Sequence, residues 1–316
     1  MNILITGADG QLGRCLRKTY EEMGGVNSIT FHKMDCVFMG RGALDIRKYS
    51  DVRTVVMSHH TDIVINCAAY TDVTAAESEP DKCAETNTHA LSALCDICEG
   101  YGTRLIHISS DFVFDGKKST PYRVTDNPMP LSQYGLTKAA GESMVCGMRG
   151  GTVIRTGWLY SAYGRNFYTK IRDRLQTLRS GEGEPGEVIE VPVDQVGTPT
   201  YAMNLAGFIL YLIGSRKYQE AGKIIHFTDE GAVSRYDFAC AVERNLNLRE
   251  MIYNDFNRNY TPLPTFVRAR YSAEDEDGII RPPYSVLNKE ETYGIGYPVM
   301  NWNDALALCM SNDEKL

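Results

Sequence analysis

Long hydrophobic runs are absent from this sequence of 316 residues, although 43% of them are apolar. No window approaches the roughly 18 consecutive apolar residues of a membrane-spanning helix, so we expect a protein without a membrane segment. An excess of positive charge is absent as well. The formal net charge is −7, and lysine and arginine are scattered without a basic stripe, which argues against nucleic acid as the main partner.

Paired cysteine motifs and histidine clusters are also lacking. The nine cysteines are odd in number and are spread through apolar segments. The C-x-x-C formed by Cys95 and Cys98 falls inside a predicted helix. We therefore predict buried, reduced thiols in a cytoplasmic protein and no metal site. Residues 1–6 carry no basic leader and read as a first strand rather than as a signal peptide.

The sequence does contain a regular alternation of apolar runs and amphipathic segments. The predicted strands cover residues 2–6, 28–31, 43–46, 62–66, 104–109, 152–155 and 188–191. The predicted helices cover residues 11–23, 49–59, 81–101, 132–146, 200–213, 236–246 and 303–310. Short, nearly continuous apolar strands between helices predict an α/β fold with a doubly wound parallel sheet of the Rossmann type.

The second half of the chain is less regular and suggests a second structural unit. Loops dominate after residue 215, and residues 181–186 are rich in glycine and glutamate. We expect residues 1–156 and about 188–214 to build the dinucleotide-binding domain. Residues from about 157–187 and 215–316 should then build a smaller, mainly C-terminal lobe that binds the substrate.

A glycine-rich turn joins the first predicted strand to the first predicted helix. Gly7, Gly10 and Gly13 follow a G-x-x-G-x-x-G spacing. This spacing permits a tight turn and a close approach of the backbone to a pyrophosphate at a helix N-terminus. We predict that a dinucleotide binds here, with Gln11 and Leu12 among its contacts; an ordinary tight turn is the alternative.

The choice between NADP and NAD depends on the end of the second strand. In that region His32 or Lys33 can meet a 2′-phosphate, whereas Asp35 can meet a free 2′-hydroxyl. We favour NADPH, and NADH stays open. At the end of the third predicted strand, Asp45 and Ile46 are expected to lie beside the adenine.

Three residues suggest the chemistry that such a cofactor would serve. Tyr134 and Lys138 are four residues apart in a predicted helix, so their side chains lie on one face. An ammonium group near a phenol lowers the pKa of the phenol. Ser110 ends a predicted strand and can hold a reacting oxygen. Together the three can protonate a carbonyl oxygen while hydride reaches its carbon, which predicts an oxidoreductase.

Longer motifs around these residues resemble the dTDP-4-dehydrorhamnose reductases, a family of extended short-chain dehydrogenases/reductases. The resembling stretches are residues 66–73 (NCAAYTDV), 76–80 (AESEP), 110–116 (SDFVFDG), 134–138 (YGLTK), 155–160 (RTGWLY), 166–167 (NF), 194–200 (DQVGTPT) and 281–287 (RPPYSVL). They extend over nearly the whole chain. The C-terminal stretches separate this branch from generic dehydrogenases.

The resemblance implies the reduction of the 4-keto group of dTDP-4-dehydro-β-L-rhamnose to dTDP-L-rhamnose with NAD(P)H. In this scheme Tyr134 donates the proton, Lys138 lowers its pKa and holds the nicotinamide ribose, and Ser110 bonds the carbonyl oxygen. Further cofactor contacts are implied at Ala68, Ala69, Tyr70 and Asn87, and further substrate contacts at Trp158, Asn166 and Arg281. A place in the interdomain core is the alternative for Trp158, and a surface ion pair is the alternative for Arg281.

Two positions depart from the family pattern. Ser110 stands where threonine is common, which keeps the hydroxyl group, and Phe112 stands where tyrosine is common, next to the expected nicotinamide. Two other functions stay open. One is a non-catalytic regulatory subunit that resembles the β-subunit of methionine adenosyltransferase, and the other is a bifunctional nucleotide-sugar epimerase/reductase. The sequence leaves the sugar's nucleotide and the oligomeric state open, with a homodimer as one option.

Overall fold

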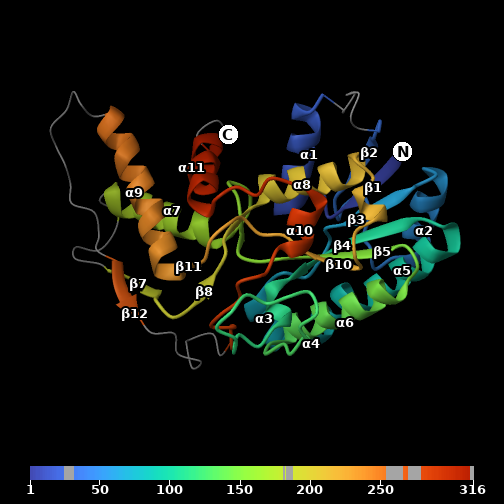
Figure 1. Cartoon of the computed structure of the whole chain (residues 1–316), viewed down its shortest axis with the longest axis horizontal. Coiled ribbons are helices and arrows are strands. Elements are labelled where there is room, and N and C mark those ends of the chain that lie inside the picture. Colours follow the sequence, from blue (N-terminus) through green and yellow to red (C-terminus); the bar gives the residue numbers. More distant parts are fainter. Residues whose placement is uncertain (25–31, 181, 183–187, 254–265, 270–278, 314–316) are drawn as a thin grey trace.

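The computed structural model describes residues 1–24, 32–180, 182, 188–253, 266–269 and 279–313, arranged in a larger and a smaller part (Figure 1). The larger part is built on a six-stranded parallel sheet with the order β10-β5-β4-β3-β1-β2. Its strands are β1 (Asn2–Thr6), β2 (Asp35–Met39), β3 (Ile63–Asn66), β4 (Arg104–Ser110), β5 (Gly151–Thr156) and β10 (Ile224–His226). Strand addition changes direction between β1 and β3, so a crevice opens there at the carboxyl ends of the strands.

The side chains of each strand alternate between two apolar layers. Within β1, Ile3 and Ile5 point to one face and Leu4 points to the other, as the two-residue period of a strand requires. The first face is covered by α1 (Gln11–Glu22), α8 (Ala202–Gly214) and α10 (Glu290–Ile295) (Figure 1). The opposite face is covered by α2 (Tyr49–Ser58), α5 (Ala90–Tyr101) and α6 (Gln133–Gly147). Because both faces are buried, the strands read as nearly continuous apolar runs.

The smaller part lies to one side of the sheet, at the left of Figure 1. Its helices are α7 (Phe167–Arg179), α9 (Arg235–Tyr253) and α11 (Trp302–Asp313). Its strand pairs are β7 (Ile189–Pro192) with β12 (Phe266–Ala269), β8 (Val196–Gly197) with β11 (Val233–Ser234), and β6 (Leu159–Tyr160) with β9 (Thr200–Tyr201). Aromatic rings fill its core, since the buried Tyr160 contacts Tyr168, Tyr201 and Phe238 at centroid separations of 6.0, 5.8 and 5.3 Å.

Most of the predicted helices and strands are confirmed within a few residues. The predicted strand at 43–46 is wrong. There the N–H groups of Ala43 and Leu44 both donate to the carbonyl of Gly40, at 3.0 and 2.9 Å, so the chain turns and β2 remains the edge of the sheet. The predicted strand at 28–31 lies outside the described residues, and so does all of 181–186 except Glu182. The structure adds α3 (Val73–Ser78), α7 and α10, which the sequence did not predict.

The division into two units follows the strand pairing. Residues of β10 fall in the range expected for the lobe, yet they pair with β5 in the main sheet. Conversely, β7 pairs with β12 and does not join that sheet. We therefore propose that the dinucleotide-binding domain includes α8 and β10, and that β7 belongs to the lobe.

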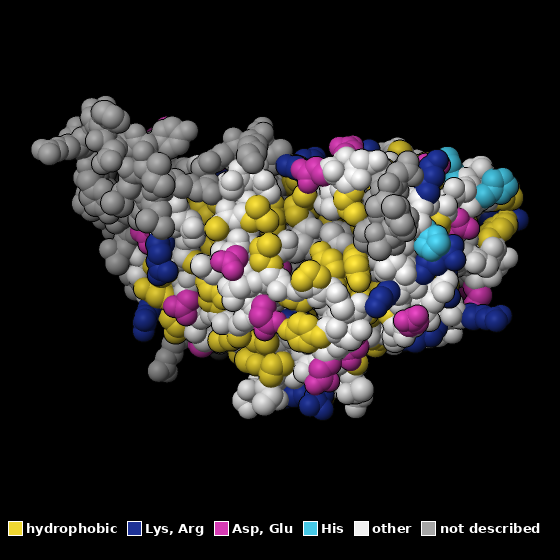
Figure 2. All heavy atoms as spheres, turned by 45° about the horizontal axis from the view of Figure 1, so that its top comes forward, with side chains coloured by type: hydrophobic (Ala, Val, Ile, Leu, Met, Phe, Trp, Pro, Cys, Tyr) yellow, Lys and Arg dark blue, Asp and Glu magenta, His cyan; other side chains and the backbone are white. Residues whose placement is uncertain are grey.

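The surface carries charges of both signs. On the face shown in Figure 2, basic and acidic side chains are interspersed between apolar ones. Within the described ranges, no helix combines the length and the apolar character needed to cross a bilayer. All nine cysteines are unpaired. Cys95 and Cys98 lie buried in α5, and burial raises the pKa of each thiol to about 12.

A buried ion pair joins the sheet to α6. Arg155 on β5 donates to both carboxylate oxygens of Glu142 on α6, with Nε–Oε1 at 2.9 Å and Nη2–Oε2 at 2.7 Å. The two side chains are only 1% and 4% exposed. The Arg155 guanidinium also lies 3.3 Å from Nε2 of His226 on β10 and over the ring of Phe114. One cation thus holds three elements of the domain together.

We predict that Arg155→Met destabilises the fold by about 3–5 kcal/mol, because it leaves the Glu142 carboxylate buried without a partner. Replacing both residues, as in Arg155→Met with Glu142→Leu, should cost less than the single change. Lys82→Ala, which removes an exposed pair with Glu79, is the control and should change stability by no more than about 1 kcal/mol. Urea unfolding measures all three; an Arg155→Met variant as stable as Lys82→Ala would contradict the prediction.

Candidate active site

A cleft of about 570 Å³ opens at the carboxyl ends of β1, β3 and β4, between the sheet and the lobe. Its walls come from the glycine turn, the loops after β2, β3 and β4, the start of α6, and the lobe residues near Trp158 and Arg235. The cleft is large enough for a dinucleotide together with a part of a second ligand. Nearly all residues that the sequence assigned to catalysis or to the cofactor line it.

The three glycines of the turn differ in what an added side chain would contact. Gly7 has a φ of 64°, and a Cβ there would lie 2.6 Å from the backbone nitrogen of Ala68. A Cβ at Gly13 would lie 2.5 Å from Cα of Ala8. At Gly10 a Cβ would meet only the Gly7 carbonyl, at 3.2 Å, and would otherwise project into the cleft. Gly7 and Gly13 are therefore required by the fold, whereas Gly10 keeps space free for a ligand.

The start of α1 suits an anionic ligand. Gly10 is its N-cap, no side chain caps it, and its first turn contains no acidic residue. The positive end of the helix dipole and its free N–H groups therefore face the cleft beside Gln11 and Leu12. A pyrophosphate fits this arrangement.

The loop after β3 forms the adjoining wall. Ala68, Ala69 and Tyr70 line the cleft, as the sequence predicted. Asn87 does not line it; it is buried behind the loop, where its amide accepts from the Tyr70 N–H at 2.9 Å and donates to the Tyr70 carbonyl at 3.1 Å. Asn87 therefore shapes the cofactor wall from behind.

The specificity region predicted around residues 31–35 lies at the wrong end of β2. The register aligns Met39 with Thr6, directly before the glycine turn, and aligns Asp35 with the first residue of β1. His32, Lys33 and Asp35 thus lie a strand length, about 13 Å, from the cleft. Their predicted contact with the cofactor ribose is wrong, because Asp35 begins β2 and the cleft lies at the other end of this strand.

Arg41 lies at the end of β2 that faces the cleft, where the sequence predicted residues 31–35. It follows the carboxyl end of β2, lines the cleft, and its side chain is 77% exposed. Asp45 and Ile46, which the sequence placed beside the adenine, line the cleft as well. The Asp45 carboxylate accepts hydrogen bonds from Arg47, with Nη2–Oδ2 at 2.6 Å, and these bonds hold its pKa well below the usual range. Arg41, whose Nε lies 4.0 Å from Oδ2 of Asp45, is therefore the candidate we propose for contact with a 2′-phosphate.

Ser110, Tyr134 and Lys138 all line the cleft. Ser132 caps α6 by accepting from the Gly135 N–H at 3.1 Å, which fixes the turn that carries Tyr134. The Ser110 hydroxyl donates to Oδ1 of Asp111 at 2.9 Å. The helix start and the end of β4 thus bring the three predicted catalytic groups together.

The electrostatics of Tyr134 differ from the expectation. Burial raises the pKa of the phenol above its usual value, and the nearby Ser110 hydroxyl opposes this shift only in part. Lys138 is not directed at the phenol, since its Nζ lies 2.6 Å from the Ile108 carbonyl and 3.0 Å from Nε2 of His107. Burial also lowers the pKa of Lys138, to about 8. Tyr134 is therefore held protonated, ready to donate.

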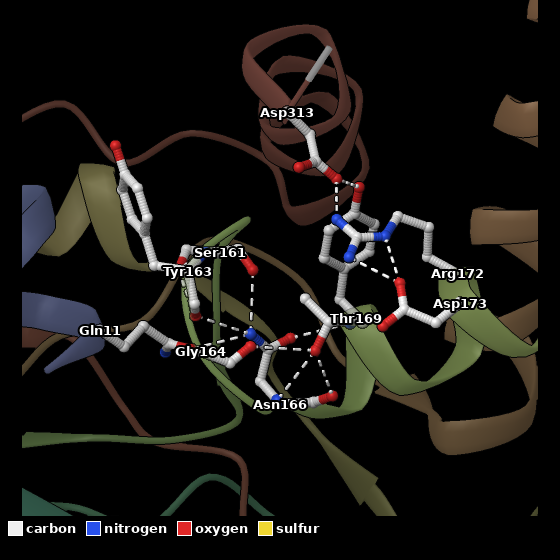
Figure 3. Close-up of polar contacts among 10 residues, drawn as sticks. Gln11, Ser161, Tyr163, Gly164, Asn166, Thr169, Arg172, Asp173 and Asp313 are labelled. Carbon is white, nitrogen blue, oxygen red and sulfur yellow. Dashed lines mark hydrogen bonds and ion pairs between the residues drawn. The ribbon is translucent and has the colours of Figure 1, made fainter. Parts of the chain in front are cut away.

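Asn166 lines the cleft, but its polar atoms are already engaged (Figure 3). Its Oδ1 accepts from the Thr169 N–H at 3.0 Å and so caps α7. Its Nδ2 donates to Oε1 of Gln11 and to the Ser161 carbonyl, both at 2.9 Å. Asn166 therefore links the lobe to the glycine turn, a role that the sequence did not reveal.

Trp158 and Arg235 form the lobe side of the cleft. The Arg235 guanidinium carbon lies 3.6 Å from the ring centroid of Trp158 and 4.7 Å from that of Phe167. Trp158 has a φ of 46°, and its indole would lie 2.4 Å from a Cβ at Gly197. Glycine at 197 thus admits the indole. The sequence missed Arg235, because an arginine at a helix start carries no signal until the fold brings it to the cleft.

Asp111 adds a buried carboxylate to the same wall. It is 1% exposed and lines the cleft, and its Oδ2 has no hydrogen-bond partner among the described residues. Burial raises the pKa of Asp111, and the nearby hydroxyl groups of Ser285 and Ser110, followed by the positive charge of Arg235, oppose that shift. Arg281 is not among the residues that line the cleft, although its charge acts on Arg235.

Within the described ranges, no group of three or more His, Cys, Asp or Glu side chains could hold a metal ion.

A family model described as "RmlD substrate binding domain" matches residues 1–314. The chain belongs to this family. It is 35% identical to the dTDP-4-dehydrorhamnose reductase of Aggregatibacter actinomycetemcomitans over 243 residues, 76% of this chain and 77% of the relative. It is 33% identical to the dTDP-4-keto-6-deoxy-D-glucose reductase of Streptomyces niveus over 306 residues, 96% of this chain and 94% of the relative.

The comparison with solved structures finds proteins of the same name. A crystal structure of dTDP-4-dehydrorhamnose reductase from Bacillus anthracis str. Ames in complex with NADP superposes with a TM-score of 0.80 at 28% identity. The match covers 98% of this chain and 99% of that one. The resemblance drawn from the motifs and the Rossmann-type fold are both confirmed.

We predict that Gly10→Val leaves a folded protein that no longer binds NADPH. The added side chain finds space in the fold but fills the place of the pyrophosphate. Calorimetry measures the affinity and circular dichroism the fold. Gly13→Ala is the contrasting variant, since its Cβ would meet backbone atoms, and it should lose stability. An unchanged NADPH affinity in Gly10→Val would rule out this site.

We also predict that Arg41→Ser weakens NADPH binding by roughly 10- to 100-fold and leaves NADH binding nearly unchanged, because a hydrogen-bonded charge contact to the 2′-phosphate is lost. Lys33→Ser removes a cation at the opposite end of β2 and is the matched control. Fluorescence titration with both nucleotides measures the ratio of affinities. If Lys33→Ser changes this ratio and Arg41→Ser does not, the assignment of Arg41 is refuted.

Proposed function

We propose that this chain is an NADPH-dependent oxidoreductase that reduces the 4-keto group of dTDP-4-dehydro-β-L-rhamnose to a hydroxyl, forming dTDP-L-rhamnose. The arrangement that carries this proposal is the meeting of Ser110, Tyr134 and Lys138 with the glycine turn in one cleft. A purely regulatory subunit has no need of a buried, protonated phenol beside a dinucleotide site.

The relatives support the class of substrate. Proteins named dTDP-4-dehydrorhamnose reductase from several bacteria match most of the chain, for example at 30% identity over 98% of it. The S. niveus relative acts, by its name, on a dTDP-linked 4-keto-6-deoxyhexose as well. A dTDP carrier and a 4-keto group are common to these names. The B. anthracis structure, which holds NADP, supports the same cofactor here.

Residues of the domain would hold the cofactor along the crevice. Gly10, Gln11 and Leu12 offer the start of α1 to the pyrophosphate, and Arg41 offers its charge to the 2′-phosphate. Ala68, Ala69, Tyr70, Asp45 and Ile46 complete the wall, with Asn87 behind it. When bound, NADPH supplies the hydride.

The chain's own residues supply the proton and hold the ketone. Tyr134 gives its phenolic proton to the developing alkoxide, and its raised pKa keeps that proton in place until then. The Ser110 O–H, which now donates to Asp111, can turn to the substrate oxygen. Lys138 would hold the nicotinamide ribose and would return a proton to Tyr134 through water in the cleft, because its Nζ is not directed at the phenol.

The lobe would hold the sugar nucleotide. Trp158 offers a fixed aromatic face, and Arg235 offers a cation that stacks on this face and whose charge also acts on Asp111. Asp111 would offer its carboxyl group to the sugar from the same wall of the cleft. Asn166 supports the site through Gln11. We place the reaction in the cytoplasm, because nine unpaired cysteines suit a reducing compartment.

We predict that the purified protein oxidises NADPH with dTDP-4-dehydrorhamnose and that Tyr134→Phe lowers turnover by roughly 10²–10⁴-fold, the usual share of general acid catalysis. NADPH binding should persist, because only a hydroxyl is removed. Ser110→Thr keeps the hydroxyl and should remain active, and it serves as the matched control. The loss of NADPH absorbance measures turnover.

Two outcomes would contradict the proposal. If the wild type binds NADPH but reduces no dTDP- or UDP-linked 4-keto sugar, the proposed reaction is wrong. If the wild type is active and Tyr134→Phe turns over normally, Tyr134 is not the proton donor.

A further inference from the structure

The amine of Lys138 is held by a buried group that plays no part in the reaction described above. His107 lies in the middle of β4, is 1% exposed and does not line the cleft. Its Nε2 is 3.0 Å from Nζ of Lys138. Lys138 donates its other hydrogen bond to the Ile108 carbonyl at 2.6 Å. The direction of the hydrogen bond between His107 and Lys138 depends on what lies behind the imidazole.

Asn66 fixes that direction. Its Oδ1 accepts from the Ala68 N–H at 3.2 Å and from the Thr6 hydroxyl at 2.6 Å. A backbone N–H can only donate, so this atom is the oxygen and the amide nitrogen is the one that faces His107. Asn66 Nδ2 lies 3.1 Å from Nδ1 of His107, in the register that pairs these two residues across β3 and β4. Nδ1 of His107 must therefore accept.

The imidazole then has its proton on the other nitrogen. A neutral histidine whose Nδ1 accepts carries its hydrogen on Nε2, and that hydrogen points at Lys138. Burial and the charge of Lys138 lower the pKa of His107 well below its usual value, so the ring stays neutral. An ammonium group has only donors, and it would oppose a second donor at 3.0 Å. A neutral amine can accept from Nε2–H and still donate to Ile108.

The fold contains the opposite arrangement for comparison. His226 is also buried beside a cation, but its Nδ1 faces the carbonyl of Asn288 at 3.0 Å. Nδ1 of His226 therefore carries the hydrogen, and its Nε2 accepts from Arg155 at 3.3 Å. His226 stabilises a charged partner, whereas the contacts of His107 disfavour one.

We propose that His107 is a positioning residue that fixes the Lys138 amine at the cleft and favours its neutral form through an Nε2–H hydrogen bond. The inference rests on the proposed function of Lys138. After Tyr134 has given its proton to the substrate, water in the cleft carries a proton from the Lys138 ammonium to the phenolate, because Nζ is not directed at the phenol. Lys138 becomes a neutral amine, whose lone pair accepts from His107. His107 keeps its own proton, and Lys138 regains one from solvent.

Other groups around Lys138 also affect its pKa. Glu142 on α6 raises the pKa of Lys138, as do Cys83 and Cys67, which face it from α4 (Pro80–Ala84) and from the loop after β3. Glu142 is itself paired with Arg155. Burial outweighs all three and lowers the pKa of Lys138. His107 acts in the same direction as burial, because it bonds the neutral form.

The test replaces His107 by glutamine, whose side-chain oxygen can accept from an ammonium group. His107→Gln should shift the alkaline limb of the pH profile of kcat/KM to higher pH by about one unit. A hydrogen bond to a charged group stabilises the charged form by enough to raise a pKa by about that much. His226→Gln removes the other buried histidine and is the matched control. It should lower stability and leave the alkaline limb where it is. An unshifted limb in an active His107→Gln variant would overturn the proposal.

Two measurements need no turnover and separate this proposal from the function itself. The ε-carbon NMR signal of ¹³C-labelled Lys138, assigned by its loss in Lys138→Arg, should titrate about one pH unit higher in His107→Gln. In the wild type, the ¹⁵N shifts of His107 should show the Nε2–H tautomer on both sides of that titration. An Nδ1–H tautomer, or equal lysine titrations in the two proteins, would refute the role of His107 even if the reductase assay succeeds.

Discussion

The cleft depends on the close contact between the glycine turn and the loop after β3. Gly7 lies so near the Ala68 backbone that a single added carbon would fall 2.6 Å from its nitrogen. Directly beneath, the Thr6 hydroxyl bonds Asn66, and Asn66 bonds His107 on the next strand. The carboxyl ends of β1 and β3 and the middle of β4 are thereby joined by polar contacts in the interior. Such contacts keep their geometry because an unpaired buried group is costly.

The lobe is attached to this edge by polar contacts as well as by packing. Asn166 bonds Gln11, a residue of the glycine turn, and Arg235 stacks on Trp158 beside the buried Asp111. The same few side chains thus define where the cofactor ends and where the sugar begins. The positive φ of Trp158 and the glycine at 197 show that the indole position is built into the backbone.

The sequence predicted the sheet and brought attention to three residues that line one cleft, because both have local signals. Apolar runs mark the buried strands, and the glycine spacing and the Tyr134–Lys138 interval have direct geometric meaning. The errors concern features that depend on distant parts of the chain. The predicted strand at 43–46 is a turn, because Gly40 accepts from two successive N–H groups. The region around Lys33 lies at the start of β2, away from the cleft, because the register of the sheet is set by pairing with β1. The pKa of Tyr134 depends on burial, and Asn166 and Arg235 acquire their contacts only when the lobe is in place.

The double use of Asn166 makes one motion depend on another. Its side chain caps α7 through Thr169 and bonds the glycine turn through Gln11 (Figure 3). Moving the lobe away from the domain breaks the second contact and leaves the amide held by the Ser161 carbonyl alone among the contacts named above. Domain opening therefore removes one of the bonds that orient the cap of α7 and lowers the local stability of that helix start. A ligand that bridges the cleft would slow hydrogen exchange at the start of α7, even where it touches no residue of that helix.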